Sequence, residues 1–545
     1  MTRERITGLV LALFTVVVVM VSQRDVGIAR DEAVYMNAGT KYADWWIGLV
    51  TFDHGIGKDA ITKSWGGKAP TDNNREHPPL MKTLFGFSEK LLHDKLGIDE
   101  LTAYRFPSAV MHGVLVWLVF LFVLGLWGFA EAIVAALFVL LLPRALFHAG
   151  LACFDAPIMT LWFATVFAYW RGLSSKGWPW YVGVVFGLAL ATKHNALLLP
   201  FALGLHYLVL GYRAGKWRGL LAHRWRMIVC VAVLGPLTLF VVWPWLWFAP
   251  FDHLGQWLSF HLKHVHYNFE YLGDNWNAPR FPWHVALVTT LFTVPVVTLV
   301  SAATGAGVWI ARALGKLRDP APDARMPALL LALSAAASIG PFFLGSTPIF
   351  GAEKHWMPAL PTICIAAAVG LVWAIKTALA ILSEKRTLAY RVHQAILGVT
   401  AGIVLLAAAA ETRAAHPYAL TWYNALAGGA PGGADHGMNR QFWGVAARGV
   451  LPELARLAPG GAHVYTHDAA PAWGFYHREK LLPANIRDAG WEQMGIDRSS
   501  LAIVIHEKHF NRHDYMIWQS YKTVQPVFVL RSDGVPIVSV YRRAP

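Results

Sequence analysis

The sequence predicts a helical protein that crosses a membrane many times and carries a small α/β domain at its C-terminal end. Of its 545 residues, 56% are hydrophobic and only 15% are charged, whereas soluble proteins carry about 25% charged residues. The mean hydropathy is +0.41. The 25 tryptophans fit the same prediction, because Trp accumulates at the two membrane interfaces.

About eleven apolar segments are long enough, or nearly long enough, to span a bilayer. They lie at 6–22, 107–128, 131–147, 157–172, 178–193, 196–212, 227–248, 284–311, 327–344, 358–380 and 393–410. The first segment could be a secretory signal, but it is long for one, and Val21-Ser22-Gln23 is a poor cleavage site. We therefore expect an uncleaved first helix.

Basic residues set the expected orientation. Lys and Arg are concentrated in four short connections, at 171–176, 213–226, 312–325 and 384–391. With the N-terminus inside, all four fall on the cytoplasmic side, as the positive-inside rule requires. The net charge of +14 then belongs largely to these loops, and it does not indicate a nucleic-acid partner.

This topology puts the connection 23–106, the loops 249–283 and 345–357, and everything after about 411 on the outer side. We expect a membrane domain at 1–410 and an extracytoplasmic α/β domain at 411–545. Within the latter, 462–466 and 501–506 resemble strands, and 527–541 resembles a hairpin that turns at 532–534. The three cysteines all lie in or beside apolar segments and predict no disulfide framework.

Two adjacent carboxylates, Asp31 and Glu32, follow the first apolar segment by a few residues. A carboxylate at the water-facing mouth of a membrane helix is well placed to take a proton from a hydroxyl. It could equally bind a cation or be solvated. Since neighbouring residues on a helix or strand point in different directions, the two cannot face the same atom.

Two further charges interrupt apolar sequence at the outer boundary. Asp155 lies in a short apolar turn, where a carboxylate is costly unless it meets a cation or water. Lys193 divides an otherwise apolar region. A buried lysine without an anion tends to lose its charge, so Lys193 indicates an anionic ligand or a carboxylate partner.

The long first outer connection, which is too long for a structureless loop, adds Glu76 and His77 before Pro78-Pro79. The prolines fix the local backbone and hold these two side chains in a defined direction, although a loop returning to the membrane would also explain the prolines. Arg105 lies at the rim of the second apolar segment, where snorkelling to the interface is the alternative to a functional role.

The outer loop before the tenth segment contributes Lys354 and His355. Carboxylates and cations thus share one face of the membrane, as transfer from a lipid phosphate donor requires: cations neutralise the phosphate and a carboxylate takes the proton of the acceptor. The sequence contains no glycine-rich phosphate loop, so it gives no indication of a nucleotide-sugar site.

The motifs together resemble the multi-pass glycosyltransferases of the C superfamily (GT-C), in particular the protein O-mannosyltransferase and lipid A aminoarabinose transferase branch. The matching motifs cover residues 1 to about 380 in the family's order. They are Asp31-Glu32, Glu76-His77-Pro78-Pro79-Leu80, Arg105-Phe106-Pro107-Ser108, Asp155-Ala156-Pro157, Ala191-Thr192-Lys193 and the stretch from Lys354 to Pro358. The stretch 416–424, followed by Gly428-Gly429, resembles a segment found after the last helix in many bacterial members.

The resemblance implies an inverting transfer from a polyprenyl-phosphate sugar to a hydroxyl, with Asp31 as the base and Glu32 and Asp155 as further catalytic candidates. In the aminoarabinose branch the residue matching Glu76 lies beside a metal, and the next residue, a Lys, meets the phosphate. His77 stands there in this chain, so Glu76 and His77 are candidates for a divalent metal, the only cofactor considered. Arg105, Lys193, Lys354 and His355 complete the expected substrate site.

The expected partners are the lipid-linked donor, an acceptor protein, lipid or glycan, and membrane lipids, in a bacterial inner membrane with the active site outside. A secondary transporter or a non-catalytic lipid- or glycan-binding protein are the alternatives. Transporters commonly show internal repeats, and none is visible here. The sequence does not identify the sugar or the acceptor.

Two more groups of polar residues could belong to a site. His261, His264 and His266 suggest either a metal or a solvated headgroup surface. His467-Asp468 and His506-Glu507 lie near the ends of expected strands. They are either ordinary polar loop residues or groups that recognise the acceptor.

Overall fold

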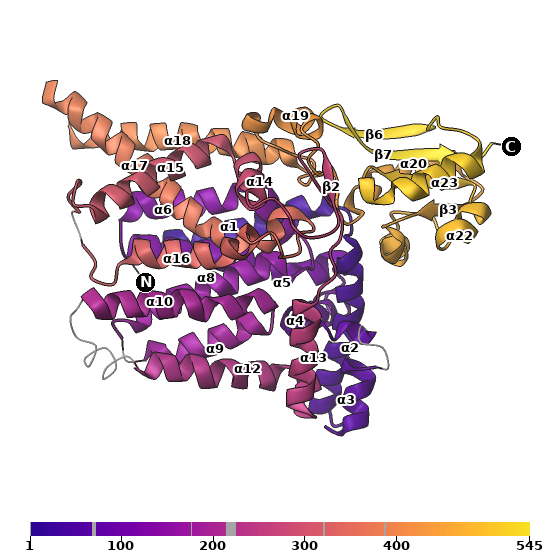
Figure 1. Cartoon of the computed structure of the whole chain (residues 1–545), viewed down its shortest axis with the longest axis horizontal. Helices are drawn as coiled ribbons and strands as arrows, with labels where there is room; N and C mark the ends of the chain where they lie inside the picture. Colours follow the sequence, from indigo (N-terminus) through magenta and orange to yellow (C-terminus); the bar gives the residue numbers. More distant parts are fainter. Residues whose placement is uncertain are drawn as a thin grey trace.

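The computed structural model describes residues 2–67, 72–175, 177–213, 225–319, 322–385 and 389–544. A bundle of long helices makes up most of the molecule, and a small α/β domain caps one end of it (Figure 1). The N-terminus lies at the opposite end of the bundle from this domain. The predicted fold class, a polytopic helical domain with a small C-terminal α/β domain, is confirmed.

Seven helical stretches of the described chain are long and apolar enough to cross a membrane, or eight if a bent pair forms one span. They are Arg3–Asp25, Glu100–Leu124, His194–Arg213, Trp225–Val242, Val296–Ala313, Met357–Ser383 and Tyr390–Ala415. The bent pair is α6 (Phe129–Leu140) and α7 (Pro143–Ala149), which meet at 69°. Pro143 begins α7 and cannot continue the hydrogen-bond ladder of α6, which explains the bend.

Shorter or less apolar helices occupy other predicted spans, so the count of about eleven stays a prediction. Besides α6 and α7, the helices of the bundle are α1 (Arg3–Ser22), α5 (Glu100–Leu124), α8 (Asp155–Gly172), α9 (Trp178–Leu190), α10 (Leu199–Arg213), α12 (Gly235–Val242), α14 (Val285–Thr293), α15 (Val296–Ala313), α16 (Pro327–Ile339), α17 (Leu360–Lys385) and α18 (Tyr390–Ala415).

The basic connections at 171–176, 213–226, 312–325 and 384–391 lie partly outside the described residues.

Helices that lie across the end of the bundle fill much of the first outer connection. These are α2 (Arg30–Val50), α3 (Lys58–Trp65) and α4 (Leu80–Ser88), with α13 (Pro250–Leu262) beside them (Figure 1). Where α2 crosses α4, a Cβ at Gly39 would lie 2.4 Å from the carbonyl oxygen of Lys82, and one at Gly86 would lie 2.1 Å from that of Gly39. Only glycine permits this approach, which brings the start of α2 close to the 76–79 segment.

The C-terminal domain contains a five-stranded mixed sheet in the order β4-β3-β5-β7-β6. Its strands are β3 (Ala462–Thr466), β4 (Ile486–Asp488), β5 (Leu501–Ile505), β6 (Phe528–Ser532) and β7 (Val535–Arg542), and β1 (Phe269–Tyr271) pairs with β2 (Asp274–Trp276) elsewhere. The remaining helices are α19 (Gly429–Asp435), α20 (Leu451–Leu457), α21 (Trp473–Arg478), α22 (Glu492–Arg498) and α23 (Asn511–Tyr521).

The two predicted strands and the hairpin occur where the sequence indicated. The last long helix, α18, continues to Ala415, so the predicted domain boundary at 410 falls inside it and remains a prediction. Residues 416–450 then pack on the membrane part. The side-chain amide of Asn424, for example, donates to the carbonyl oxygens of Leu291 and Val294 at 2.7 and 2.6 Å.

Candidate active site

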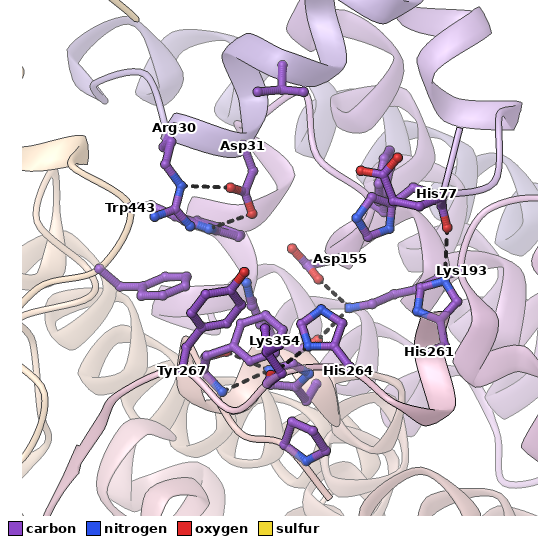
Figure 2. Close-up of a pocket in the computed structure, with 18 of the residues that line it drawn as sticks. Arg30, Asp31, His77, Asp155, Lys193, His261, His264, Tyr267, Lys354 and Trp443 are labelled. Atoms are coloured by element: carbon purple, nitrogen blue, oxygen red, sulfur yellow. Dashed lines mark hydrogen bonds and ion pairs between the residues drawn. The ribbon is translucent and has the colours of Figure 1, made fainter. Parts of the chain in front are cut away.

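A cavity of about 620 Å³ lies where the helix ends, the loops that connect them and the C-terminal domain meet. Figure 2 shows Asp31 and Trp443 on one side of it and the Asp155–Lys193 pair on the other. Seven of the nine predicted site residues line this cavity: Asp31, Glu76, His77, Asp155, Lys193, Lys354 and His355. Glu32 and Arg105 do not.

Asp31 stands in the first turn of α2, and its side chain is 26% exposed. One carboxylate oxygen accepts a hydrogen bond from Nε of Arg30 at 3.1 Å, and the other accepts one from Nε1 of Trp443 at 2.9 Å. A carboxylate has about four lone-pair sites. Two donors therefore hold Asp31 in one orientation and leave it able to accept a further proton from the cavity.

Glu32 points away from the cavity and caps the start of α2. Its Oε2 accepts from the backbone N–H of Ala29 at 3.1 Å, and its Oε1 accepts from that of Ala152 at 2.8 Å. Arg105 also donates to both oxygens, at 2.7 and 2.9 Å. Both side chains are 0% exposed.

Arg105 uses its remaining N–H groups on the carbonyl oxygens of Gln23, Val26 and Gly27. The guanidinium is thus saturated inside the protein, where no phosphate reaches it. Glu32 and Arg105 therefore form a buried ion pair at the turn into α2, apart from the residues that line the cavity, and we leave both out of the proposed substrate site.

Asp155 and Lys193 form an ion pair of 2.7 Å in the cavity wall. Burial opposes ionisation of Asp155, but the ammonium of Lys193 overrides it and holds the pKa of this carboxyl well below its usual range. The Lys193 side chain is 14% exposed and the Asp155 side chain 7%. The ammonium therefore retains access to the cavity.

Lys354 lies between three aromatic rings. Its Nζ is 3.9 Å from the ring centre of Trp443, 4.4 Å from that of Phe442 and 4.7 Å from that of Phe350. Among the described residues it has no ion-pair partner, and burial lowers its pKa to about 8 against the opposing charges of Asp155 and Asp31. This cation–π cage holds a positive charge beside the cavity without neutralising it.

Glu76 and His77 line the cavity near a buried lysine, Lys82. Glu76 accepts from the Asn74 amide at 2.9 Å, and burial raises its pKa against the charge of Lys82. The ammonium of Lys82 donates to the backbone oxygen of His77 at 3.0 Å. The His77 ring packs among aromatic side chains, and burial lowers its pKa well below the usual value, which keeps it neutral.

These residues do not fit the metal that the resemblance suggested. Over the described ranges, no three His, Cys, Asp or Glu side chains converge to hold an ion, and this holds for the histidines at 261, 264 and 266 too. Lys82 already supplies the positive charge facing Glu76. We therefore assign no metal to Glu76 and His77.

His355 adds no positive charge to the cavity, because its imidazole is neutral. Its Nε2 contacts the backbone of Phe350, 3.2 Å from the amide nitrogen, and burial lowers its pKa well below the usual value. Nearby, His261 stacks on His194 with ring centres 3.9 Å apart. Both line the cavity together with His264, so the predicted histidine loop contributes imidazole rings to the wall.

The C-terminal domain completes the cavity with two carboxylates. Asp468 follows β3 and Glu507 follows β5, and both line the cavity. Arg30 donates to Asp468 at 2.9 Å. Burial raises the pKa of Asp468, and burial together with Asp468 raises that of Glu507 well above its usual value. Of the pair His467-Asp468 noted in the sequence, only Asp468 lines the cavity. His467 contacts Asp514 instead, at 3.2 Å.

Sequence reasoning missed Arg30, Trp443 and Lys82. Arg30 directly precedes Asp31 and Glu32, and a cation next to two carboxylates is a signal that it neutralises one of them. Trp443 lies 412 positions from its partner Asp31, and no local pattern marks it. Lys82 could have been noticed as a charge in the apolar stretch that follows Pro78-Pro79.

Comparisons with known proteins bear on the fold and on part of the sequence. Residues 76–247 match the family model described as dolichyl-phosphate-mannose-protein mannosyltransferase. Among solved structures, ArnT from Cupriavidus metallidurans in the apo state is 15% identical with a TM-score of 0.51, and the match covers 97% of each chain. The Archaeoglobus fulgidus oligosaccharyltransferase in the apo form is 11% identical with a TM-score of 0.50, covering 93% of this chain and 71% of that one.

No curated protein sequence matches this chain. At these identities the structural matches establish the fold, and the family model adds a sequence match within the membrane part. The resemblance that the ordered motifs predicted is therefore confirmed: this membrane protein has the GT-C glycosyltransferase fold and resembles the protein mannosyltransferase and ArnT branch of that superfamily.

Proposed function

We propose that the protein is an inverting glycosyltransferase that moves a sugar from a polyprenyl-phosphate donor to a hydroxyl acceptor. One observation carries the proposal: the Asp31 carboxylate and the ammonium groups of Lys193 and Lys354 line the same cavity. A base and two cations in one enclosed space are what the displacement of a sugar from a phosphate needs.

The lipid-phosphate donor is supported by the family model, whose description names a dolichyl-phosphate sugar. The two ammonium groups would hold the phosphate. Lys193 donates to Asp155 at 2.7 Å and to the backbone oxygen of Lys354 at 3.5 Å, which leaves one of its three N–H donors. Lys354 carries its charge in an aromatic cage. The cavity lies at the end of the membrane helices, where a lipid chain could remain in the bilayer while its phosphate enters.

Asp31 would act as the general base. The acceptor hydroxyl gives its proton to the free lone pair of Asp31, and its oxygen forms a bond to C1 of the sugar. The bond between C1 and the phosphate oxygen breaks, and polyprenyl phosphate leaves with the electron pair. Lys193 and Lys354 stabilise the charge that develops on that phosphate. A single displacement inverts the configuration at C1.

The remaining features belong to the same proposal. The donor sugar is a hexose or a pentose, the acceptor is a protein, a lipid or a glycan, and transfer takes place on the outer face of a bacterial inner membrane. The histidines of the cavity wall and the carboxyl groups of Asp468 and Glu507 would offer hydrogen bonds to sugar hydroxyls. The proposed orientation follows from the positive-inside rule applied to the four basic connections of the sequence.

The experiment offers the purified protein a panel of labelled polyprenyl-phosphate sugars together with crude membranes, and asks which macromolecule becomes labelled. Asp31→Asn keeps the size of the side chain and removes its basicity. We expect transfer to fall by about 10²-fold or more, the lower end of the range for losing a general base, while donor binding and protein yield stay close to those of the wild type.

Asp25→Asn is the matched control. Asp25 belongs to the same segment, but its side chain is 71% exposed and does not line the cavity. Within the described residues its one ion-pair contact is with His416, at 3.4 Å. Transfer by this variant should be normal. Binding of donors by the wild type without any transfer would favour the non-catalytic alternative, and near-normal turnover by Asp31→Asn would show that the base lies elsewhere.

A further inference from the structure

Trp443 contacts the catalytic carboxylate from a segment that precedes the C-terminal sheet. It is 2% exposed, and its indole Nε1–H donates to Oδ2 of Asp31 at 2.9 Å (Figure 2). Its backbone oxygen accepts from the N–H of Arg30 at 2.9 Å. Trp443 is therefore bound to the start of α2 twice, once through its side chain and once through its backbone.

The backbone of Trp443 is in a conformation that large side chains rarely adopt. Its φ is 68°, and that of Gly444 is 71°. For a tryptophan this left-handed conformation costs free energy, and such a residue persists only where its surroundings fix it. This left-handed backbone conformation directs the indole N–H toward Asp31. A backbone in the α or β region of φ/ψ space would direct the side chain elsewhere.

The face of the same indole supports the cage of Lys354, whose Nζ is 3.9 Å from the ring centre. One side chain thus contacts both the base and one of the two cations proposed to meet the phosphate. Because the ring is rigid, it fixes the spacing between them. The ring edge also approaches His148, with ring centres 5.7 Å apart.

We propose that Trp443 is a positioning residue for the transfer reaction: its N–H fixes the orientation of the Asp31 carboxylate, and its ring holds Lys354 at a fixed distance from it. The inference rests on the proposed function and adds a residue to it. Trp443 and Arg30 each donate to a different oxygen of Asp31, so each oxygen keeps a lone pair that can take the proton of the acceptor.

Other groups also act on Asp31 electrostatically, and the test must separate their effects from that of Trp443. The charged and titratable groups that face Asp31 in the described residues are Arg30, Tyr35, Cys153, Lys354 and Asp468. Replacement of Trp443 by Phe leaves all of them in place. It removes the N–H donor and keeps an aromatic face for Lys354.

The first experiment measures transfer by W443F as a function of donor concentration, with the donor that the wild type uses. We expect kcat to fall about tenfold or more, the effect of losing one hydrogen bond to a charged group, with little change in donor KM. An unchanged kcat would overturn the proposal.

W162F is the matched control. Trp162 is 1% exposed and donates its indole N–H to Ser334 at 2.8 Å, and it does not line the cavity. It loses one buried indole hydrogen bond, as W443F does, but at a distance from Asp31. A fall in kcat in W162F as large as that in W443F would attribute the effect to a general loosening of the structure and overturn the proposal.

A double-mutant cycle tests the dependence on Asp31 directly. In the D31N background the base is already gone, so W443F should cause no further loss of kcat. If the fold-loss of kcat in the double variant equals the product of the two single fold-losses, Trp443 acts independently of Asp31. That result would overturn the assignment.

A third measurement does not depend on turnover. A carbodiimide labels accessible carboxyl groups, and mass spectrometry quantifies the labelled Asp31 peptide at one fixed pH. Without the indole N–H that occupies one of its oxygens, Asp31 should be labelled a few-fold faster in W443F than in the wild type and in W162F. If the wild type transfers no sugar from any donor, the proposed function fails, yet equal labelling of Asp31 in W443F and in the wild type would still overturn the role of Trp443.

Discussion

Two ion pairs of equal length lie near the candidate active site, and they serve different purposes. Glu32–Arg105 and Asp155–Lys193 both join a carboxylate to a cation at 2.7 Å. In the first pair both side chains are fully buried, and the guanidinium of Arg105 donates to Glu32 and to backbone oxygens on all its nitrogens. In the second pair the ammonium of Lys193 lies in the cavity wall and keeps one donor free beside its bonds to Asp155 and the backbone oxygen of Lys354.

The difference shows that charge and position at the membrane rim do not identify a substrate-binding cation. Arg105 and Lys193 look equivalent in the sequence, as charges at the rim of an apolar segment. What separates them is whether their hydrogen-bonding capacity is already satisfied. A guanidinium with carboxylate and carbonyl partners on all sides is part of the framework, whereas a lysine that keeps one donor free can bind an anion.

The largest effect that tests this comparison is expected at Arg105. In R105M the Glu32 carboxylate stays buried without its partner, which should destabilise the protein by about 3–5 kcal/mol. Thermal unfolding of the protein in detergent would measure this, with the double variant E32Q/R105M as the control, since it leaves no uncompensated charge. Normal stability with lost affinity for polyprenyl phosphate would instead return Arg105 to the phosphate site.

The next effect is expected at Lys193. K193M should bind polyprenyl phosphate about tenfold or more weakly, because a hydrogen bond to a charged group contributes about 1.5–3 kcal/mol. The variant also leaves Asp155 buried without a partner, so D155N/K193M is the control: it should recover stability and remain weak in binding. Unchanged affinity in both variants would make this pair structural, like the first.

Much of the fold could be predicted because local patterns determine it. The apolar segments correspond to helices, and the strands at 462–466 and 501–506 and the hairpin at 528–542 appear at the predicted places. Helix lengths were harder, because breaks such as the 69° bend before Pro143 depend on packing as well as on sequence. The helices α2, α3 and α4 within the first outer connection were not predicted at all.

The site was predicted as a set of residues but not as an arrangement. Seven of the nine candidates do line one cavity, because ordered motifs carry that information. Adjacent residues Asp31 and Glu32 could be expected to diverge, but the sequence could not say which one met Arg105. Contacts such as Trp443 with Asp31 join positions far apart in the chain and depend on how the C-terminal segment docks, which no periodicity encodes.

The smallest expected effect concerns Lys354, which differs from both ion pairs in having rings in place of a carboxylate. Burial lowers its pKa to about 8, so the ammonium is charged below that pH and loses its proton above it. Affinity for polyprenyl phosphate should therefore fall a few-fold as the pH rises through 8, because a cation at the phosphate is lost. Equilibrium binding measured from pH 6.5 to 9.5 would test this.

K354R provides the matched comparison, because a guanidinium keeps its charge across this range and can occupy the same aromatic cage. Its binding curve should stay flat where the wild-type curve declines. The phosphate itself cannot cause the decline, since its second ionisation, with a pKa of about 6, is nearly complete before this range. Parallel declines in the two proteins would mean that another group titrates, and the cage of Phe350, Phe442 and Trp443 would then hold Lys354 for packing alone.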